Sequence, residues 1–219
     1  MSSERIYLRR VYAFLTVSMF ILSMVVSGCA EKGPILLNVV YQAPAEKAGA
    51  ASAIVVGVSP FRDVREAQPS VLGRRTIPSG MQSDLVVKGT VAEIATISLK
   101  EALTRRGIAV KDVAAWDLTA EGMPAEGAAL LLGGEIKVFW LESLAAASAF
   151  NTHLKASVQL KVVAGDTGEK KVIRTIDVSS KLDQDMLYSR ERLENMLSEA
   201  LSSAIDQVFN DQELKKRLQ

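Results

Sequence analysis

The strongest constraint on the fold is an unbroken apolar stripe near the C-terminus. In residues 193–209, apolar side chains recur at every third or fourth position, which is the spacing of one face of an α-helix. A helix with one apolar face must bury that face against another element, so the pattern predicts a long helix that covers a sheet. The stripe consists of Leu193, Met196, Leu197, Ala200, Leu201, Ala204, Ile205, Val208 and Phe209.

A different pattern, in residues 151–163, has the period of a β-strand. Apolar residues alternate with polar ones, so one face of this strand is expected to be buried and the other to face water. Residues 165–168 contain two glycines and predict a hairpin turn. The partner strand is then expected over residues 171–182.

A second helix is predicted over residues 90–106, because its start and its end are both marked. Thr90 and Glu93 have the spacing of a capping box, in which each side chain accepts a hydrogen bond from the backbone amide of the other. Arg105 and Arg106 stand at the negative end of the helix dipole, and Gly107 suits the position that follows a helix.

The remaining apolar runs are short and predict the other strands. Loops are expected at 42–52 and 114–127. Residues 35–219 therefore predict a single small α+β domain, with a mainly antiparallel sheet packed against two amphipathic helices. This length suits one hydrophobic core rather than two. The other strands are expected over residues 35–41, 53–58, 71–77, 85–88, 108–113 and 128–142.

The N-terminal segment has the features of a lipoprotein signal peptide over residues 1–28. It is basic at its start, continues as an apolar run, and ends in Val26, Ser27 and Gly28 before Cys29, the only cysteine. The run is shorter than the roughly 20 apolar residues that a membrane-spanning helix needs. An ordinary secretory signal or an uncleaved anchor remains the alternative interpretation.

In the lipoprotein class that this segment resembles, Cys29 becomes the first residue of the mature chain and carries a thioether lipid and an acyl chain such as palmitate. Two or more acyl chains anchor a protein stably to a membrane. Residues 29–34 are then the lipidated N-terminus and tether. No aspartate follows Cys29, so the sorting rule of enteric bacteria predicts a periplasm-facing protein of the outer membrane rather than the inner membrane.

The charge of the chain excludes one class of partner. Removal of residues 1–28 takes away three arginines and one glutamate and changes the net charge from +1 to −1. A nearly neutral domain has no basic surface of the kind that binds nucleic acid. Aromatic residues make up only 5% of the chain, which argues against a stacking platform for bases or sugars.

Catalytic or metal chemistry has little support in the sequence. His153 is the only histidine and falls on the polar face of the predicted strand, where a solvated side chain is expected. No set of residues has the spacing of a zinc site, and no cofactor is expected. Gly133 and Gly134 lie inside a predicted strand, so they indicate close packing or a bulge rather than a phosphate loop. Asp166 is expected to form a turn.

Three charged residues follow the strand at 53–58 and form the main candidate site. Asp63 and Arg65 can pair with each other or cap nearby backbone groups, or, with Arg62, they can contact a partner. Arg74 and Arg75 are candidates to join that contact.

Three aromatic residues, Phe139, Trp140 and Phe150, flank the alanine-rich residues 144–150. Core packing is the default for such side chains. The alternative is an exposed apolar patch for a protein or lipid partner.

The order of elements, together with the N-terminal signal, resembles the YajG-type lipoproteins of the bacterial envelope. The resemblance is carried by residues 105–108, 130–136, the strand after His153, and 210–213. Residues 58–65 resemble a strand-end segment common among envelope lipoproteins. The family implies a small α+β domain, an anchor and an envelope location, and it carries no established catalytic residues.

From these features we expect a non-enzymatic lipoprotein that binds another envelope component as an assembly or transport accessory. One alternative is a carrier or sensor that holds a small apolar or lipid ligand between the sheet and the terminal helix. A hydrolase built on His153 is the third hypothesis, although no nucleophile-elbow motif is present.

Overall fold

The sheet is built around β7 (Leu130–Ala145), the strand with which four others pair. The computed structural model describes residues 33–43, 54–124, 128–146 and 151–218. Val26, Ser27, Gly28, Cys29 and Phe150 lie outside the described residues. The described strands are β1 (Ile35–Leu36), β2 (Val55–Val58), β3 (Arg62–Asp63), β4 (Val71–Thr76), β5 (Gln82–Val86), β6 (Ala109–Asp112), β7, β8 (Asn151–Asp166) and β9 (Lys171–Leu187), and the helices are α2 (Val91–Arg105), α3 (Arg190–Val208) and α4 (Gln212–Leu218).

The sheet is mixed, which corrects the prediction of a mainly antiparallel sheet. The chain from β2 to β4 runs parallel to one edge of β7, with β2, β3 and β4 pairing in turn along it. The other edge of β7 pairs antiparallel with β8, which pairs antiparallel with β9. Side-chain periodicity reports which face of a strand is buried, but it carries no information about the direction of the neighbouring strand.

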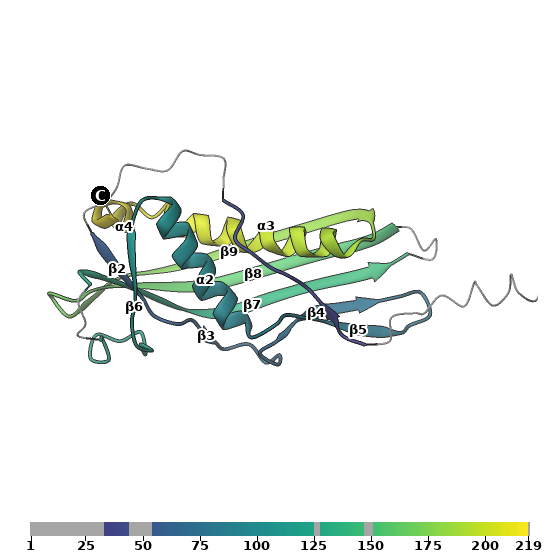
Figure 1. The fold of residues 1–219 in the computed structure, drawn as a ribbon, viewed down its shortest axis with the longest axis horizontal. Helices are drawn as coiled ribbons and strands as arrows, with labels where there is room; N and C mark the ends of the chain where they lie inside the picture. Colours follow the sequence, from purple (N-terminus) through teal and green to yellow (C-terminus); the bar gives the residue numbers. More distant parts are fainter. Residues whose placement is uncertain (1–32, 44–53, 125–127, 147–150, 219) are drawn as a thin grey trace, which may run out of the picture. The chain divides into compact units, whose positions relative to one another are not determined.

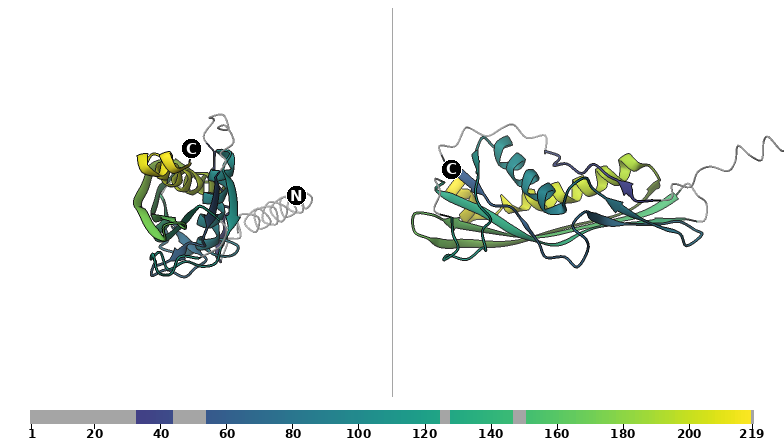
Figure 2. Two further views of the ribbon diagram at one scale, coloured as in Figure 1. Left: turned by 90° about the vertical axis from the view of Figure 1, so that its left-hand side faces the viewer. Right: turned by 60° about the horizontal axis from the view of Figure 1, so that its bottom comes forward.

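Both predicted helices lie on the same face of this sheet (Figure 1), and the sheet curves around them (Figure 2). α3 packs on β8 and β9, and its predicted apolar stripe is buried from Leu193 to Val208. The predicted alternation in β8 is also confirmed, because Leu154, Ala156 and Val158 are buried. The main hydrophobic core therefore lies between one face of the sheet and the helices, and a smaller buried cluster around Trp116 is separate from it.

α2 begins and ends where the sequence predicted. Thr90 and Glu93 form the complete capping box, with the Thr90 amide donating to Glu93 Oε2 (2.9 Å) and the Glu93 amide donating to Thr90 Oγ1 (3.2 Å). Gly107 follows the helix with a φ of 76°, a conformation that favours glycine.

The N-terminal strand is shorter than predicted. Only Ile35 and Leu36 pair with β5, and residues 37–42, here called the strap, lie along α3 instead (Figure 1). The backbone amides of Asn38, Val40 and Gln42 donate to side chains of α3 that are four residues apart. The acceptors and distances are Glu194 Oε1 (2.9 Å), Ser198 Oγ (3.1 Å) and Ser202 Oγ (2.7 Å). Alternate side chains of the strap, including Leu37 and Val39, are buried.

α4 is an additional short helix after α3, which the sequence patterns did not predict. Asp211 Oδ1 accepts from the amides of Glu213 (3.1 Å) and Leu214 (3.0 Å), which caps the start of the helix. Leu214 and Leu218 are buried, so α4 closes one end of the core. Among the described residues, none of the helices is long and apolar enough to cross a membrane.

Candidate functional site

Arg65 and Asp63 form a buried ion pair that fixes the chain after β3 to the sheet. Arg65 Nε and Nη2 donate to the two carboxylate oxygens of Asp63 at 2.8 and 2.7 Å, and Arg65 Nη1 donates to the carbonyls of Val71 and Phe139, both at 2.9 Å. The side chains are only 4% and 13% exposed, respectively. Of the alternatives left open by the sequence, this geometry favours the internal ion pair, because the guanidinium is enclosed and directed at groups of its own chain.

Arg62 and Val64, which alternate with this pair, point outward. The Arg62 side chain is 46% exposed and forms an ion pair with Glu135 on β7. Val64 is 52% exposed, although its amide donates to the carbonyl of Ile136 at 3.2 Å. The hydrogen bond from Arg62, together with the positive charge of Lys161, holds the pKa of Glu135 below its ordinary value despite partial burial.

A groove of about 440 Å³ lies next to Val64, and we call it the β3–β7 groove. Val138 and Trp140 of β7 lie on the face of the sheet that is turned away from the helices, because each of them pairs with a residue on the polar face of β8. Phe139 points the other way and is buried in the core, as predicted. The groove is lined by Val64, Arg65, Glu66, Ala67, Lys137, Val138, Phe139 and Trp140.

The structure does not bring the other two arginines to this groove. Arg74 and Arg75 pair with Glu142 and Ser143 of β7, about seven residues or 23 Å along the strand from the partner of Arg62. Arg74 is exposed and forms an ion pair with Asp84 at 3.3 Å. Arg75 instead extends to the face that carries the helices.

The remaining candidates have structural surroundings. His153 is half exposed on the polar face, with Asp185 at 3.0 Å and Asp183 at 3.2 Å. Asp166 accepts from the amides of Gly168 and Glu169, as expected of a turn residue. Gly134 is closely packed as predicted, since an added Cβ would lie 2.5 Å from the Lys161 carbonyl oxygen.

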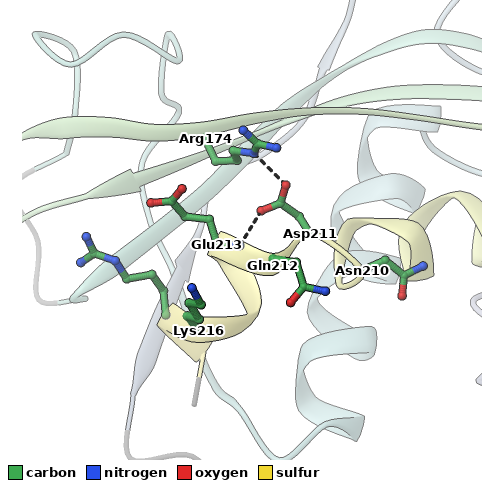
Figure 3. Close-up of a pocket in the computed structure, with 7 residues that line it drawn as sticks. Arg174, Asn210, Asp211, Gln212, Glu213 and Lys216 are labelled. Atoms are coloured by element: carbon green, nitrogen blue, oxygen red, sulfur yellow. Dashed lines mark hydrogen bonds and ion pairs between the residues drawn. The ribbon is translucent and has the colours of Figure 1, made fainter.

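A larger depression, of about 520 Å³, lies at the corner between α3, α4 and β9 (Figure 3). Its charged groups are largely paired within the chain: Arg174 donates to Asp211 at 2.7 Å, and Arg217 to Asp166 at 2.9 Å. Burial raises the pKa of Asp211, but the backbone hydrogen bond from Leu214 and the Arg174 ion pair bring it below the ordinary value. These contacts hold α4 against the β8–β9 hairpin, so this corner has a structural role that the sequence did not reveal.

The chain segment beside the β3–β7 groove is fixed by internal contacts. Arg65 ties the segment that carries Val64 to two strands, so the exposed side chains there are held in place. Restricting motion in this way lowers the entropy cost of binding.

Comparisons with solved structures find distant likenesses. Protein XCC0632 from Xanthomonas campestris has 11% identity and a TM-score of 0.47, with 80% of this chain and 90% of that chain covered. A neuraminyllactose-binding hemagglutinin homolog from Helicobacter pylori has 11% identity and a TM-score of 0.47, with coverages of 83% and 96%. Lipoprotein GNA1162 from Neisseria meningitidis has 13% identity and a TM-score of 0.36, with coverages of 72% and 99%. These values assign no function to the chain.

The comparison with curated proteins finds no match. A family model described as "Uncharacterized lipoprotein" matches residues 93–219, from the first turn of α2 through α4. This range covers more than half of the chain and includes β7, β8, β9 and α3, on which the resemblance to YajG-type proteins rests. The chain therefore belongs to this lipoprotein family, whose YajG-type members its sequence resembles.

Proposed function

We propose that the protein is a non-enzymatic accessory that binds another envelope protein through the β3–β7 groove. In this proposal, acylated Cys29 anchors the chain to the outer membrane with the α+β domain facing the periplasm. The membership of a lipoprotein family supports the anchor. Anchoring would confine the protein to one membrane surface and raise its effective concentration near partners on that surface.

The observation that carries the proposal is the position of Val64, an exposed apolar residue beside the groove. The buried Asp63–Arg65 ion pair holds the segment that carries it. Val64 is 52% exposed, and Trp140 is half-buried at the floor of the groove. Partly exposed tryptophan and arginine are the residue types that most often dominate binding energy at protein interfaces. Lys137, which also pairs with Asp177, lines the groove, so the partner should offer an apolar side chain flanked by a carboxylate that can reach Lys137.

The test is crosslinking in cells from two exposed positions of the full-length lipoprotein. A photoreactive amino acid at Val64 should give one dominant crosslinked envelope protein. The control is the same amino acid at Ile97, which is 59% exposed on α2 and away from the groove. The Val64→Asp substitution should reduce capture of the partner by a probe at Glu66 at least tenfold without loss of folding, whereas Ile97→Asp should not.

Equal crosslinking from Val64 and Ile97, or unchanged capture by the Val64→Asp variant, would contradict the proposal. Substitutions of Asp63 or Arg65 are unsuitable as tests of contact, because they remove the ion pair that shapes the groove. The anchor has a separate test. The Cys29→Ser variant should accumulate as an unacylated precursor, and normal processing of that variant would contradict the lipoprotein assignment of Cys29.

The carrier hypothesis receives less support from the packing. Leu197, Ala200 and Leu201 of α3 are fully buried against the sheet. An apolar ligand at that interface would have to displace the helix from β8 and β9.

A further inference from the structure

Three buried polar atoms at one end of the sheet have no hydrogen-bond partner among the described residues. They are Arg75 Nε on β4, Ser143 Oγ on β7 and Thr152 Oγ1 on β8. Ser143 is 0% exposed and Thr152 is 1% exposed, so water does not reach their side chains from the surface. Leaving such groups unsatisfied is costly, and polar atoms buried in this way normally have a partner.

The three residues are neighbours on one face of the sheet. Arg75 pairs with Ser143 across β4 and β7, and Ser143 pairs with Leu154 across β7 and β8. Thr152 is two residues before Leu154, so it lies on the same face and diagonally opposite Ser143. This is the face that carries the helices, because Leu154 belongs to the hydrophobic core.

The side chain of Arg75 extends over this face of the sheet toward Tyr188. Its guanidinium carbon lies 3.6 Å from the centre of the Tyr188 ring, and Tyr188 directly follows β9. Since β7 and β8 stand between β4 and β9, the side chains of Arg75 and Tyr188 meet over the part of the sheet that bears Ser143 and Thr152.

The charge of Arg75 has no ion-pair partner among the described residues. Its guanidinium lies over the Tyr188 ring, and that ring cannot accept the hydrogen bond that Nε–H donates in the plane of the guanidinium. Ser189, the residue after Tyr188, caps the N-terminus of α3, and Figure 1 shows the start of α3 at the same end of the sheet as the C-terminal ends of β4, β7 and β9. A helix N-terminus attracts anions and disfavours cations. The guanidinium and the start of α3 therefore both favour a bound anion.

We propose that an oxyanion, either a carboxylate or a phosphate, binds between Arg75, Ser143 and Thr152. Its oxygens accept hydrogen bonds from Arg75 Nε and from the two hydroxyl groups, which satisfies all three atoms at once. A water molecule could bond to the hydroxyls but would leave the positive charge unbalanced. The oxyanion is either a free ion or the head group of an amphiphile, since apolar Leu154 and Met186 lie alongside.

This site is on the face opposite the β3–β7 groove and uses none of its residues. The inference therefore does not depend on the proposed protein-binding function, and either can fail alone.

The experiment is calorimetric titration of the full-length protein in a non-ionic detergent with sodium phosphate and, separately, with the carboxylates sodium acetate and sodium octanoate. Sodium chloride at matched ionic strength is the blank. Saturable binding of one of the two oxyanions is expected, and the Arg75 Nε–H resonance should shift during the titration. Phosphate binding alone identifies a free ion as the ligand, whereas tighter binding of octanoate than of acetate identifies the head group of an amphiphile.

The decisive variant is Ser143→Ala with Thr152→Val, which removes both hydroxyls with almost no change of volume. Binding should weaken at least tenfold while the circular dichroism spectrum stays unchanged. Arg74→Leu is the matched control, because Arg74 is the neighbouring arginine on β4 but is exposed and paired with Asp84; it should bind like the parent protein. The proposal is overturned if neither oxyanion binds saturably to the parent protein, or if the double variant binds with the parent affinity.

Discussion

Removing the charge of Arg65 should destabilise the fold far more than removing the charge of Arg62, three residues earlier. Arg65→Met keeps an unbranched apolar stem in place of the arginine but leaves Asp63, 13% exposed, without its cation. Breaking a buried ion pair by removing one partner costs about 3–5 kcal/mol, because the remaining charge stays buried. The carbonyls of Val71 and Phe139 would also lose their donors.

Arg62→Met is the matched control. The Arg62 side chain is 46% exposed, and its ion pair with Glu135 is partly screened by water. Pairs of this kind contribute about 0–1 kcal/mol. In addition, Lys161 stays 3.6 Å from the second oxygen of Glu135 and compensates for part of the loss.

Urea unfolding followed by tryptophan fluorescence measures both free energies, since Trp140 lines the groove next to Arg65. For a domain of this size, 1 kcal/mol corresponds to about 2–4 °C in Tm. Arg65→Met should therefore lower Tm by about 6–20 °C, and Arg62→Met by at most a few degrees. In the double variant with Asp63→Asn, the loss should be smaller than the sum of the single losses.

A loss of less than about 1 kcal/mol for Arg65→Met, or equal losses for the two methionine variants, would refute this reasoning. Either result would mean that water or another group compensates Asp63 when the guanidinium is absent.

Three further measurements test the packing. Gly134→Ala should lower the free energy of unfolding in urea by about 1–3 kcal/mol, because the new Cβ would lie 2.5 Å from the Lys161 carbonyl oxygen and the Phe61 ring. Gly168→Ala is the control and should be tolerated, because its nearest contact would be 3.4 Å. Equal losses of stability in the two variants would contradict the close packing at Gly134. The double variant Ser198→Ala, Ser202→Ala should speed amide hydrogen exchange at Val40 and Gln42 several-fold. Exchange at Asn38 should change less, because its amide donates to Glu194. An equal change along the whole strap would show that the two hydroxyls do not hold the strap. The backbone hydrogen bond from Glu169 and the ion pair with Arg217 lower the pKa of Asp166, and the pKa of Asp211 is lowered too. The two ionised carboxylates therefore stabilise α4 at a pH above their ordinary pKa of 3.8, and this stabilisation is lost as the pH falls below 3.8. The amide resonances of Gln212–Leu218 should lose their helical shifts between pH 5 and pH 2 in the parent protein, and unchanged shifts would contradict the role of these carboxylates.

Much of the local structure was predictable because it depends on neighbours in the chain. The stripe in residues 193–209 and the alternation after His153 became α3 and β8 with the predicted faces buried. The capping box at Thr90 formed because both partners lie within one helical turn. The candidate pair Asp63 and Arg65 is likewise local, since two residues on a strand end can always reach each other.

Three features depend on the packing of the whole domain and could not be predicted from local patterns. They are the direction of the strands around β7, the docking of the strap on α3 and the position of Arg75 beside Tyr188. In each case the deciding contact joins residues far apart in the chain, and the local pattern is the same whether or not that contact forms. Residues 37–42 alternate like a strand, yet the amides of Asn38, Val40 and Gln42 donate to side chains of α3 rather than to a neighbouring strand. Residue order alone predicts which faces are buried, because side-chain period follows from backbone geometry. Which surfaces meet depends on the packing of the whole domain.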